Sequence, residues 1–432
     1  MKKNIEFEKT NFGKKMFNLI ERLYPICRSI TGEGVRETIK IINEHIPIKI
    51  YEIPTGKKVF DWEVPKEWNI KDAYIKNSKG KKIVDFKKSN LHVVNYSTPI
   101  HKKMTLKEIK QAYGKHFFTL PKYPDWIPYK TSYYKENWGF CMTHNQYENL
   151  SKDTYEVFID SELKNGHLTY GELIIKGSLK GEILVSTYIC HPSLCNDNLS
   201  GIVLSTFLAK YLANKELKYS YRFLFIPETI GSITWLSLNE KKIPRIKFGF
   251  VITCVGDSGN ITFKKTKNGD TELDKATIKV LQDLFKEKNY QILNFVPMGS
   301  DERQYSSPGI NIPMVSIMRT QYTKYPQYHT SADNLNIMNE KCLDEIFNIY
   351  IKVIDIIEND KIYVNKYSKC EPQLGKRGIY SSSSEENLVF KWILNMTDGK
   401  HSLLDIAIRS NISFDKIKNA SDILYSKGLI SI

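Results

Sequence analysis

The sequence has no long hydrophobic run and few cysteines. No stretch of its 432 residues approaches the roughly 20 apolar residues of a membrane-spanning helix. The basic N-terminus, MKKNIEFEKTNFGKK, lacks the apolar segment of a secretory signal. The seven cysteines are odd in number, scattered, and form no Cys-x-x-Cys pair, which argues against a disulfide framework. We therefore expect a cytoplasmic protein with free thiols and no membrane span.

Basic residues outnumber acidic ones but do not cluster. The chain has 63 Lys and Arg against 48 Asp and Glu, a net charge of +15. Lys and Ile are frequent throughout, which is more typical of genomic composition than of a binding patch. The C-terminal residues 373–432 hold 8 basic and 6 acidic side chains and are nearly balanced. The charge pattern therefore argues against nucleic acid as a partner.

Length and hydrophobic periodicity predict more than one domain. At 432 residues the chain exceeds the size at which a single core stops growing. Residues 11–45 show helical spacing, whereas residues 48–170 contain short strand-like runs broken by Pro, Gly and Asn. Strands alternate with helices from residue 171 onwards. This alternation predicts an α/β fold with a mostly parallel, doubly wound sheet.

The predicted boundaries follow from these changes in pattern. A discontinuous catalytic domain comprises residues 1–47 and 171–365, and an inserted all-β domain comprises residues 48–170. After a polar linker, residues 373–432 contain three short amphipathic helices that end at Gly428-Leu-Ile, the layout of a winged helix. Such a domain is a candidate for contact with a protein partner, a substrate or a second copy of the chain.

The most informative segment is HPSLCNDNLSG, residues 191–201, which follows a buried strand-like run. Open α/β sheets bind ligands at the carboxyl ends of their strands, and imidazole and carboxylate are zinc ligands. His191 and Asp197 are therefore candidate metal ligands, although a solvated loop has the same composition. Cys190 reads as core packing. Cys195 lies inside the loop and is a weaker candidate ligand.

Two later segments place further polar side chains after strands. The strand RFLFIP ends directly in Glu228, where a carboxylate can serve as a general base. Alternatively, Glu228 is an acid at a helix start that Thr229 or Ser232 caps. Gly-Ser-Asp at residues 299–301 follows later, and His329 lies in a loop rich in Tyr, Pro and Asn. No apolar helix face explains His329 as a core residue.

In this order, His-x5-Asp-Asn-x-Ser-Gly, Glu-x-x-Gly, Gly-Ser-Asp and Tyr-His-Thr resemble the zinc aminopeptidase-like superfamily. The chain is most similar to a bacterial group that has an inserted β domain and a C-terminal winged helix. The resemblance covers essentially the whole chain. It implies that His191, Asp197 and His329 are metal ligands and that Glu228 is the catalytic base. It also implies a link to surface-polysaccharide biosynthesis.

Three positions depart from the family pattern. Thr229 stands where a second glutamate would bind metal, Thr253 stands where a metal aspartate is expected, and Ser193 replaces the carboxylate that orients the first histidine. A two-zinc site needs a ligand set for each ion and a shared carboxylate. His191, Asp197 and His329 are instead the three-ligand composition of a mononuclear zinc site. We therefore expect one zinc ion rather than two.

Four further side chains are candidates for substrate contact by position alone. Tyr305 or Tyr328 could stabilise a developing oxyanion, and Arg303 or Arg319 could pair with a substrate carboxylate. Each of the four could equally be a structural or surface residue. The segment 123–141 holds seven aromatic residues, which could form a wall for a sugar or peptide or pack beneath the β domain.

The leading hypothesis is a zinc-dependent amide hydrolase whose substrate is a peptide or an aminoacyl or N-acyl conjugate, including such a conjugate of a sugar. The second is a metal-containing scaffold or binding protein in surface-polysaccharide biosynthesis, because the missing carboxylates suggest a degraded site. The retention of base and ligands together argues against it. A winged-helix regulator is the least favoured, given the balanced charge of that segment.

Overall fold

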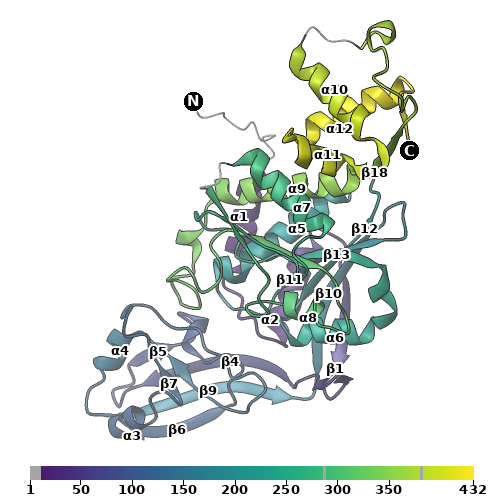
Figure 1. Cartoon of the computed structure of the whole chain (residues 1–432). Coiled ribbons are helices and arrows are strands. Elements are labelled where there is room, and N and C mark those ends of the chain that lie inside the picture. The colour runs from purple at the N-terminus through teal and green to yellow at the C-terminus, as the bar shows by residue number, and fades with distance from the viewer. Residues whose placement is uncertain (1–10, 286–288, 380–382) are drawn as a thin grey trace. The chain divides into compact units, whose positions relative to one another are not determined.

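The computed structural model describes residues 11–285, 289–379 and 383–432. Within these ranges the chain divides into two compact units. The larger comprises residues 11–267 and 292–347, and the smaller comprises residues 268–291 and 348–432 (Figure 1). Among the described helices, none combines the length and the apolar character that crossing a membrane would require.

An eight-stranded mixed sheet forms the core of the larger unit, in the order β1-β10-β12-β11-β13-β16-β14-β15. Its central strands β12, β11, β13 and β16 run parallel, while β1, β10 and β14 pair antiparallel with their neighbours. The predicted α/β class is therefore confirmed, with the parallel part confined to the centre. The strands are β1 (Lys49–Pro54), β10 (His167–Ile175), β11 (Glu182–Tyr188), β12 (Ser220–Ile226), β13 (Ile246–Val251), β14 (Ile261–Lys264), β15 (Tyr290–Leu293) and β16 (Met314–Met318).

Continuous burial explains the apolar character of the central strands. Every residue of β11 is buried, as expected for a parallel strand covered on both faces. Helix α5 (Ser200–Leu212) packs on β11 and on α1 (Phe12–Leu23), and α2 (Glu33–Asn43) packs on β10. Helix α6 (Ile230–Leu238) follows β12 and is almost entirely buried. These helices hold the carboxyl ends of the strands in fixed positions.

The inserted β domain is a separate four-stranded antiparallel sheet, in the order β5-β4-β9-β6. Its strands are β4 (Glu67–Lys76), β5 (Lys82–Asp85), β6 (Ile100–Thr105) and β9 (Thr154–Lys164), with the short helices α3 (Leu106–Gln111) and α4 (His144–Glu148) and the paired strands β7 (Phe117–Phe118) and β8 (Phe140–Cys141). Because β1 and β10 pair within the large sheet, the separate sheet begins at Glu67 and ends at Lys164. The predicted insert, residues 48–170, thus also contains β1 and the first residues of β10, which belong to the large sheet.

A small hairpin precedes this domain and belongs to the core of the larger sheet. Strands β2 (Lys58–Val59) and β3 (Trp62–Glu63) pair antiparallel, and β2 packs against α6. Val59 and Val64 share one buried cluster with Ile230 of α6. The hairpin is thereby held beside the helix that follows Glu228.

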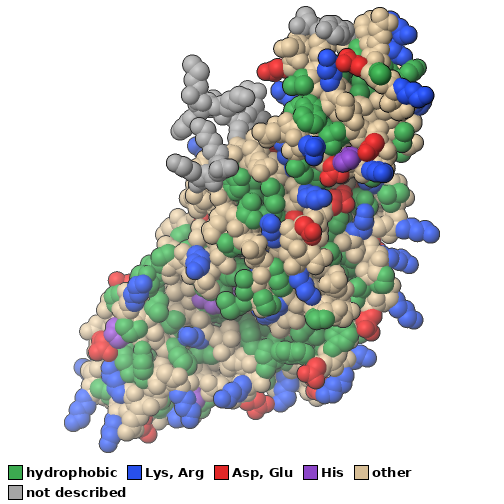
Figure 2. Space-filling model, in the orientation of Figure 1, with side chains coloured by type: hydrophobic (Ala, Val, Ile, Leu, Met, Phe, Trp, Pro, Cys, Tyr) green, Lys and Arg blue, Asp and Glu red, His purple; other side chains and the backbone are tan. Residues whose placement is uncertain are grey.

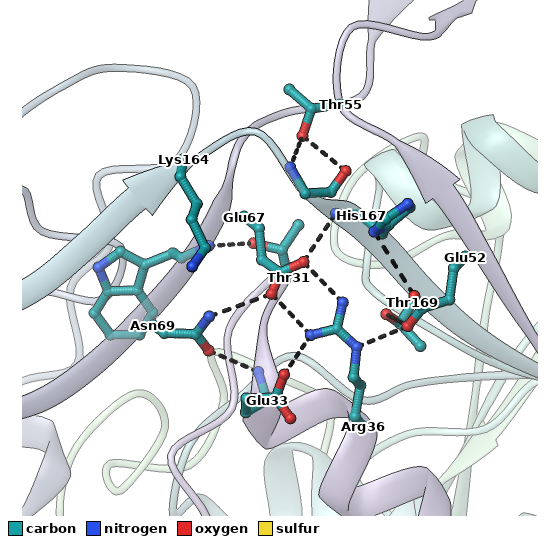
Figure 3. A network of polar contacts seen from close by, with 12 residues as sticks. Thr31, Glu33, Arg36, Glu52, Thr55, Glu67, Asn69, Lys164, His167 and Thr169 are labelled. Atoms are coloured by element: carbon teal, nitrogen blue, oxygen red, sulfur yellow. Dashed lines mark hydrogen bonds and ion pairs between the residues drawn. The ribbon is translucent and has the colours of Figure 1, made fainter.

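A polar network connects α2 to the first strand of the inserted domain (Figure 3). Arg36 donates two hydrogen bonds to the carboxylate of Glu67, at 2.8 and 2.7 Å, and a third to Glu52 of β1 at 2.7 Å. Glu67 also accepts the backbone N–H of His167 at 2.8 Å. Such a bidentate, charge-assisted pair is stronger than a single exposed ion pair. Arg36 therefore joins α2 to β1 and β4, and Glu67 extends the network to the start of β10.

The smaller unit contains the predicted winged helix. Its elements include α7 (Glu272–Leu284), α10 (Ser384–Met396), α11 (Leu403–Ser410) and α12 (Phe414–Ser426), with a sheet in the order β18-β17-β19. The sheet strands are β17 (Ile362–Asn365), β18 (Asp398–Ser402) and β19 (Ile430–Ser431). Helix α9 (Glu340–Asn359) begins in the larger unit and ends in the smaller. The domain begins before the predicted residue 373, because β17 belongs to its sheet.

Charged side chains are mixed over the visible face of the molecule. Figure 2 shows Lys and Arg spread among Asp and Glu, without a single basic patch. This distribution matches the expectation from the sequence that the positive net charge is dispersed.

Candidate metal centre and active site

Polar side chains gather where the four parallel strands end. His191 follows β11, Glu228 follows β12 and Thr253 follows β13, each within three residues of its strand. His329 comes from the longer loop after β16. Because adjacent parallel strands end at the same edge of the sheet, these side chains can share one site.

His191, Asp197 and His329 form the centre of this site. Their ligand atoms all lie within 4.8 Å of one another. Nε2 of His329 is 2.9 Å from Oδ2 of Asp197, and Nε2 of His191 is 3.8 Å from the same oxygen. Asp197 is fully buried, His191 is nearly so, and the side chain of His329 is 36% exposed. The three predicted ligands are therefore brought together by the fold.

These side chains fit a metal ion. Oδ2 of Asp197 and Nε2 of His329 are both buried, yet neither has a hydrogen-bond partner of acceptable geometry. A buried carboxylate oxygen and a ring nitrogen that face each other without a hydrogen bond are costly unless something else satisfies them. Two imidazoles and a carboxylate around one point are a donor set that zinc accepts.

The electrostatics of His191 also suit metal binding. Burial lowers the pKa of His191 to about 4, and the positive charges of His329 and Arg28 act in the same direction, although Asp197 opposes them. The ring is therefore neutral at neutral pH. A neutral imidazole has a free lone pair, which a metal ligand must offer.

Cys190 and Arg28 fix the orientation of His191. Sγ of Cys190 lies 3.3 Å from Nδ1 of His191 and accepts the backbone N–H of Glu228 at 3.3 Å. Arg28 is completely buried and donates from Nε to the carbonyl oxygen of His191 at 2.8 Å. The hydroxyl of Ser193 donates instead to Tyr24 O at 2.7 Å. The thiol of Cys190 therefore stands at the ring nitrogen that the absent carboxylate would otherwise bind.

The hydroxyl of Tyr188 donates a hydrogen bond to the second carboxylate oxygen of Asp197. This oxygen is Oδ1, and the same hydroxyl lies 2.7 Å from Oγ1 of Thr253. Burial raises the pKa of Asp197, but His191 and His329 outweigh it and lower the pKa to about 2. Asp197 is consequently ionised, with only Oδ2 open to a ligand. Thr253 contacts the hydroxyl of Tyr188, and as a threonine it offers the site no carboxylate ligand.

Asp333 shapes the loop that carries Asp197. Its carboxylate accepts the backbone N–H of Asn196 at 2.6 Å and that of Asp197 at 3.1 Å, and it also accepts the hydroxyl of Tyr325 at 3.1 Å. Burial raises the pKa of Asp333 to about 7. Asp333 follows His329 by four residues, so one loop both supplies a ligand and positions another.

Glu228 is partly buried and lies beside a buried acid, Asp301 of the Gly-Ser-Asp segment. Desolvation raises the pKa of Glu228 well above 4.5, and the charges of Asp301 and Asp197 raise it further, whereas Arg303 opposes them. Desolvation also raises the pKa of Asp301, to about 6. Two carboxyl groups that titrate together can hold one proton between them. This is the behaviour expected of a proton-transfer group.

Thr229 links Glu228 to this neighbouring acid. Its backbone N–H donates to Oδ1 of Asp301 at 2.8 Å, and Oγ1 accepts Nη2 of Arg303 at 2.9 Å. Its φ of 63° lies in the left-handed region, which a β-branched residue seldom adopts. The side chain of Thr229 makes no capping hydrogen bond to α6. The simple capping alternative for this segment is therefore not observed.

The inserted β domain closes one side of the site through Tyr129. The ring of this buried residue lies 5.3 Å from that of His191 and 5.1 Å from that of His329. Its backbone N–H donates to His329 O at 2.7 Å. The backbone N–H of Ile127 donates to Oγ of Ser331 at 2.9 Å, and the backbone N–H of Ser331 donates to Ile127 O at 2.8 Å. These bonds tie a segment of the insert to the loop that carries His329.

The four side chains predicted to contact substrate have different surroundings. Arg303 lies beside Thr229, and the ring of Tyr328 stacks on His329 at 3.9 Å. Tyr305 is completely buried, and its hydroxyl contacts Ser186. Arg319 is 4% exposed and binds Glu345 and backbone carbonyls. We keep Arg303 and Tyr328 in the candidate pocket and leave out Tyr305 and Arg319, whose side chains have structural partners.

Several residues of the site had no assigned role at the level of sequence. They are Arg28, Tyr129, Tyr188, Asp301 and Asp333, together with the orienting contact of Cys190. The Gly-Ser-Asp and Tyr-His-Thr segments pointed towards Asp301 and Asp333. Nothing in the local pattern marked Arg28 or Tyr129, because their contacts to His191 and His329 join distant parts of the chain.

Two family models match the chain. A model described as a domain of unknown function, DUF4910, matches residues 17–360, and a winged helix-turn-helix model matches residues 361–432. The chain belongs to the DUF4910 family. This DUF4910 chain is 56% identical over 426 residues to a Clostridium acetobutylicum protein named "Putative polysaccharide biosynthesis protein with aminopeptidase-like domain", covering 97% of this chain and 96% of the other.

Solved structures show the same fold. A crystal structure from Clostridium acetobutylicum described as a "putative peptidase" is 56% identical, with a TM-score of 0.93 over 97% of this chain and 96% of that one. A zinc aminopeptidase from Bacillus subtilis has a TM-score of 0.58 at 13% identity, over 80% and 94% of the two chains. A peptidase M28 precursor from Shewanella amazonensis reaches 0.55 at 11% identity, over 81% and 95%. The resemblance to zinc aminopeptidases is therefore confirmed at the level of the fold.

Proposed function

We propose that this protein is a zinc-dependent amide hydrolase that removes an aminoacyl or N-acyl group from a small substrate. The observation that carries the proposal is the convergence of His191, Asp197 and His329, with two buried atoms lacking hydrogen bonds, beside the acid pair of Glu228 and Asp301. A metal ion with a purely structural role would not need two carboxyl groups of raised pKa beside it.

We further propose that the site holds one ion. His191 Nε2, Asp197 Oδ2 and His329 Nε2 are the ligand atoms, and the hydrogen bond from Tyr188 to Oδ1 supports a single ion by keeping the second oxygen occupied. A zinc ion bound by three protein ligands supplies a Lewis acid and makes water more acidic.

Glu228 transfers the proton during the reaction. A carboxylate oxygen of Glu228 accepts a proton from the attacking water and later delivers it to the leaving amine. The raised pKa of Glu228, caused mainly by desolvation and then by the negative charge of Asp301, favours the delivery step. Arg303 donates a hydrogen bond to Thr229, and its positive charge limits the rise in the pKa of Glu228. Its guanidinium group can also pair with a carboxylate or phosphate of the substrate.

The substrate proposed is an aminoacyl or N-acyl sugar, with a small peptide as the alternative. The Clostridium acetobutylicum relative is named for polysaccharide biosynthesis, and sugars carrying amide groups are natural substrates for an amide hydrolase in that setting. Tyr129 lies against both histidines and bounds the site on one side, where it can contact the acyl group.

The test is hydrolysis of aminoacyl and N-acetyl glucosamine derivatives by purified protein, with Glu228→Gln as the decisive variant. We expect the variant to lose at least about a hundredfold in rate while retaining its zinc. Glu240→Gln replaces an exposed glutamate beyond α6 and should leave both unchanged.

Two outcomes would reject this function. Zinc-loaded wild-type protein that hydrolyses none of these amides or small peptides would favour the scaffold alternative. Loss of zinc together with activity in Glu228→Gln would make Glu228 a ligand rather than the base.

A further inference from the structure

A run of aromatic rings leads from the metal ligands to the protein surface. Tyr129 contacts both histidines, and its hydroxyl lies 3.0 Å from that of Tyr133. The ring of Tyr133 contacts that of Tyr134 at 6.2 Å, and Tyr134 contacts Trp62 at 5.1 Å. Tyr129 is buried and Tyr133 is partly buried, whereas the last two are open to solvent.

Trp62 and Tyr134 are 38% and 48% exposed, values that are high for such large apolar side chains. Their ring planes meet at 75°, so the contact of one ring with the edge of the other leaves ring surface uncovered. Phe60, in the turn between β2 and β3, is also 49% exposed. Exposed aromatic side chains gathered at one place are typical of binding surfaces.

The backbone holds Tyr134 in this position at a cost. Its φ of 64° lies in the left-handed region, which bulky residues avoid. Strained residues of this kind cluster at functional sites. Trp62 is held in turn by the β2–β3 hairpin, which packs on α6 through Val59.

The aromatic pair is anchored beside the helix that follows Glu228. Val59 and Val64, which flank Trp62, share one buried cluster with Cys190 and with Ile230, two residues after Glu228. Tyr133, the neighbour of Tyr134, packs against the same cluster. Trp62 and Tyr134 therefore extend from the side of the site on which Glu228 lies.

The neighbouring side chains suit a hydroxyl-bearing ligand. Lys66 and Glu136 form an exposed ion pair at 3.1 Å, and Glu136 is two residues from Tyr134. Glu63, next to Trp62, forms a second exposed pair with Lys58. Carboxylates and ammonium groups can exchange such exposed pairs for hydrogen bonds to hydroxyl groups. An aromatic face attracts the weakly positive C–H groups on the apolar side of a pyranose ring.

We propose that Trp62 and Tyr134 form a stacking platform for a pyranose ring, so that the group leaving the active site is an amino sugar. The inference rests on the proposed function, because it names the leaving group of that reaction. It predicts binding of simple glycosides even when no amide is cleaved.

The test is therefore a binding measurement that does not need catalysis. Methyl N-acetylglucosaminide is titrated into metal-free protein and into Glu228→Gln, and saturation-transfer NMR reports which ligand protons touch the protein. We expect transfer mainly to the ring protons on one face of the sugar. In Trp62→Ala the affinity should fall about tenfold.

Matched variants separate the platform from general effects. Tyr113→Ala removes an aromatic ring that is 41% exposed elsewhere in the inserted domain and should not change the affinity. Trp62→Leu serves as a second variant if Trp62→Ala does not fold. Since Trp62 is partly exposed, we expect both to keep the wild-type melting temperature within a few degrees.

Three results would overturn the platform. They are absence of saturation transfer to the glycoside in the wild type, equal affinity in Trp62→Ala, and tighter binding of L-phenylalaninamide than of the glycoside at the same residues. The last would indicate a peptide subsite. A chain that binds the glycoside as predicted but cleaves no amide would refute the proposed reaction and leave the sugar site standing.

Discussion

Sγ of Cys190 lies 3.3 Å from Nδ1 of His191 and accepts the backbone N–H of Glu228, so one thiol contacts both a candidate metal ligand and the candidate base. A hydrogen bond at Nδ1 fixes the tautomer that presents the Nε2 lone pair to Asp197. In this chain a sulfur atom thus orients the histidine ring, a role that a carboxylate often has beside a metal-binding histidine.

Replacement of this thiol should weaken metal binding. We expect Cys190→Ala to lower zinc affinity about 10- to 100-fold, because the ring of His191 loses its orienting acceptor. Cys190→Ser should retain most of the affinity, since a hydroxyl can still accept from Nδ1. Competition with a fluorescent chelator measures both, with Cys342→Ala as the control. Equal affinities for Cys190→Ala and the wild type would show that the contact is only packing.

Asp333 should matter for stability as well as for the site. Asp333→Ala leaves the backbone N–H groups of Asn196 and Asp197 without their acceptor, which we expect to lower the free energy of unfolding by about 2 to 4 kcal/mol. Asp333→Asn keeps one acceptor oxygen and should cost less. Urea unfolding of the wild type, Asp333→Asn and Asp333→Ala gives the order of their free energies of unfolding. A larger loss in Asp333→Asn than in Asp333→Ala would contradict the role of Asp333 as an acceptor.

The pair of Arg36 and Glu67 should make stability depend on pH in acid. Hydrogen bonds from Arg36 lower the pKa of Glu67 from 4.5 to about 2, against the opposing effect of desolvation and with help from the N–H of His167. The stabilisation is therefore complete above pH 4.5 and is lost as the pH falls towards 2. Its full size is about 3 kcal/mol.

Unfolding of Glu67→Gln at several pH values tests this dependence. The variant should be less stable than the wild type at neutral pH, and the difference should shrink between pH 4.5 and 2. Glu63→Gln, which removes a half-exposed partner of Lys58, should have little effect at any pH. A constant difference between Glu67→Gln and the wild type would mean that the ionisation of Glu67 contributes nothing.

The winged helix should not bind duplex DNA measurably at physiological salt. Helix α12 carries Lys416 and Lys418 against Asp415 and Asp422, and Lys418 pairs with Asp422 at 3.2 Å. Few cations are therefore left for phosphates. Fluorescence anisotropy with random duplex DNA at about 0.15 M salt measures this. Binding that weakens linearly with the logarithm of salt concentration would instead indicate a DNA-binding surface.

Much of the site followed from the order of strands in the sequence. His191 and Glu228 directly follow apolar runs, and the carboxyl ends of adjacent parallel strands must meet. Asp197 and His329 follow in loops whose composition offered no core role. These positions could be assigned because strand burial and loop polarity are local properties of the chain.

The supporting contacts could not be assigned in the same way. Tyr129 reaches the histidines from the inserted domain, and Arg28 reaches His191 from the connection between α1 and α2. Both depend on how distant segments pack. Tyr305 looked suitable because it follows the Gly-Ser-Asp segment, yet the turn of α8 (Glu302–Tyr305) buries its ring. The pattern did not separate β1 and β10, which belong to the large sheet, from the strands of the inserted domain, because all are short strand-like runs.

Zinc content per chain tests the central claim most directly. Elemental analysis of protein purified without added metal is applied to the wild type, His329→Ala and His401→Ala, the last replacing an exposed histidine of the winged helix. We predict close to one zinc ion in the wild type and His401→Ala and almost none in His329→Ala. Two ions per wild-type chain would contradict the single-ion site, and none would contradict the metal centre itself.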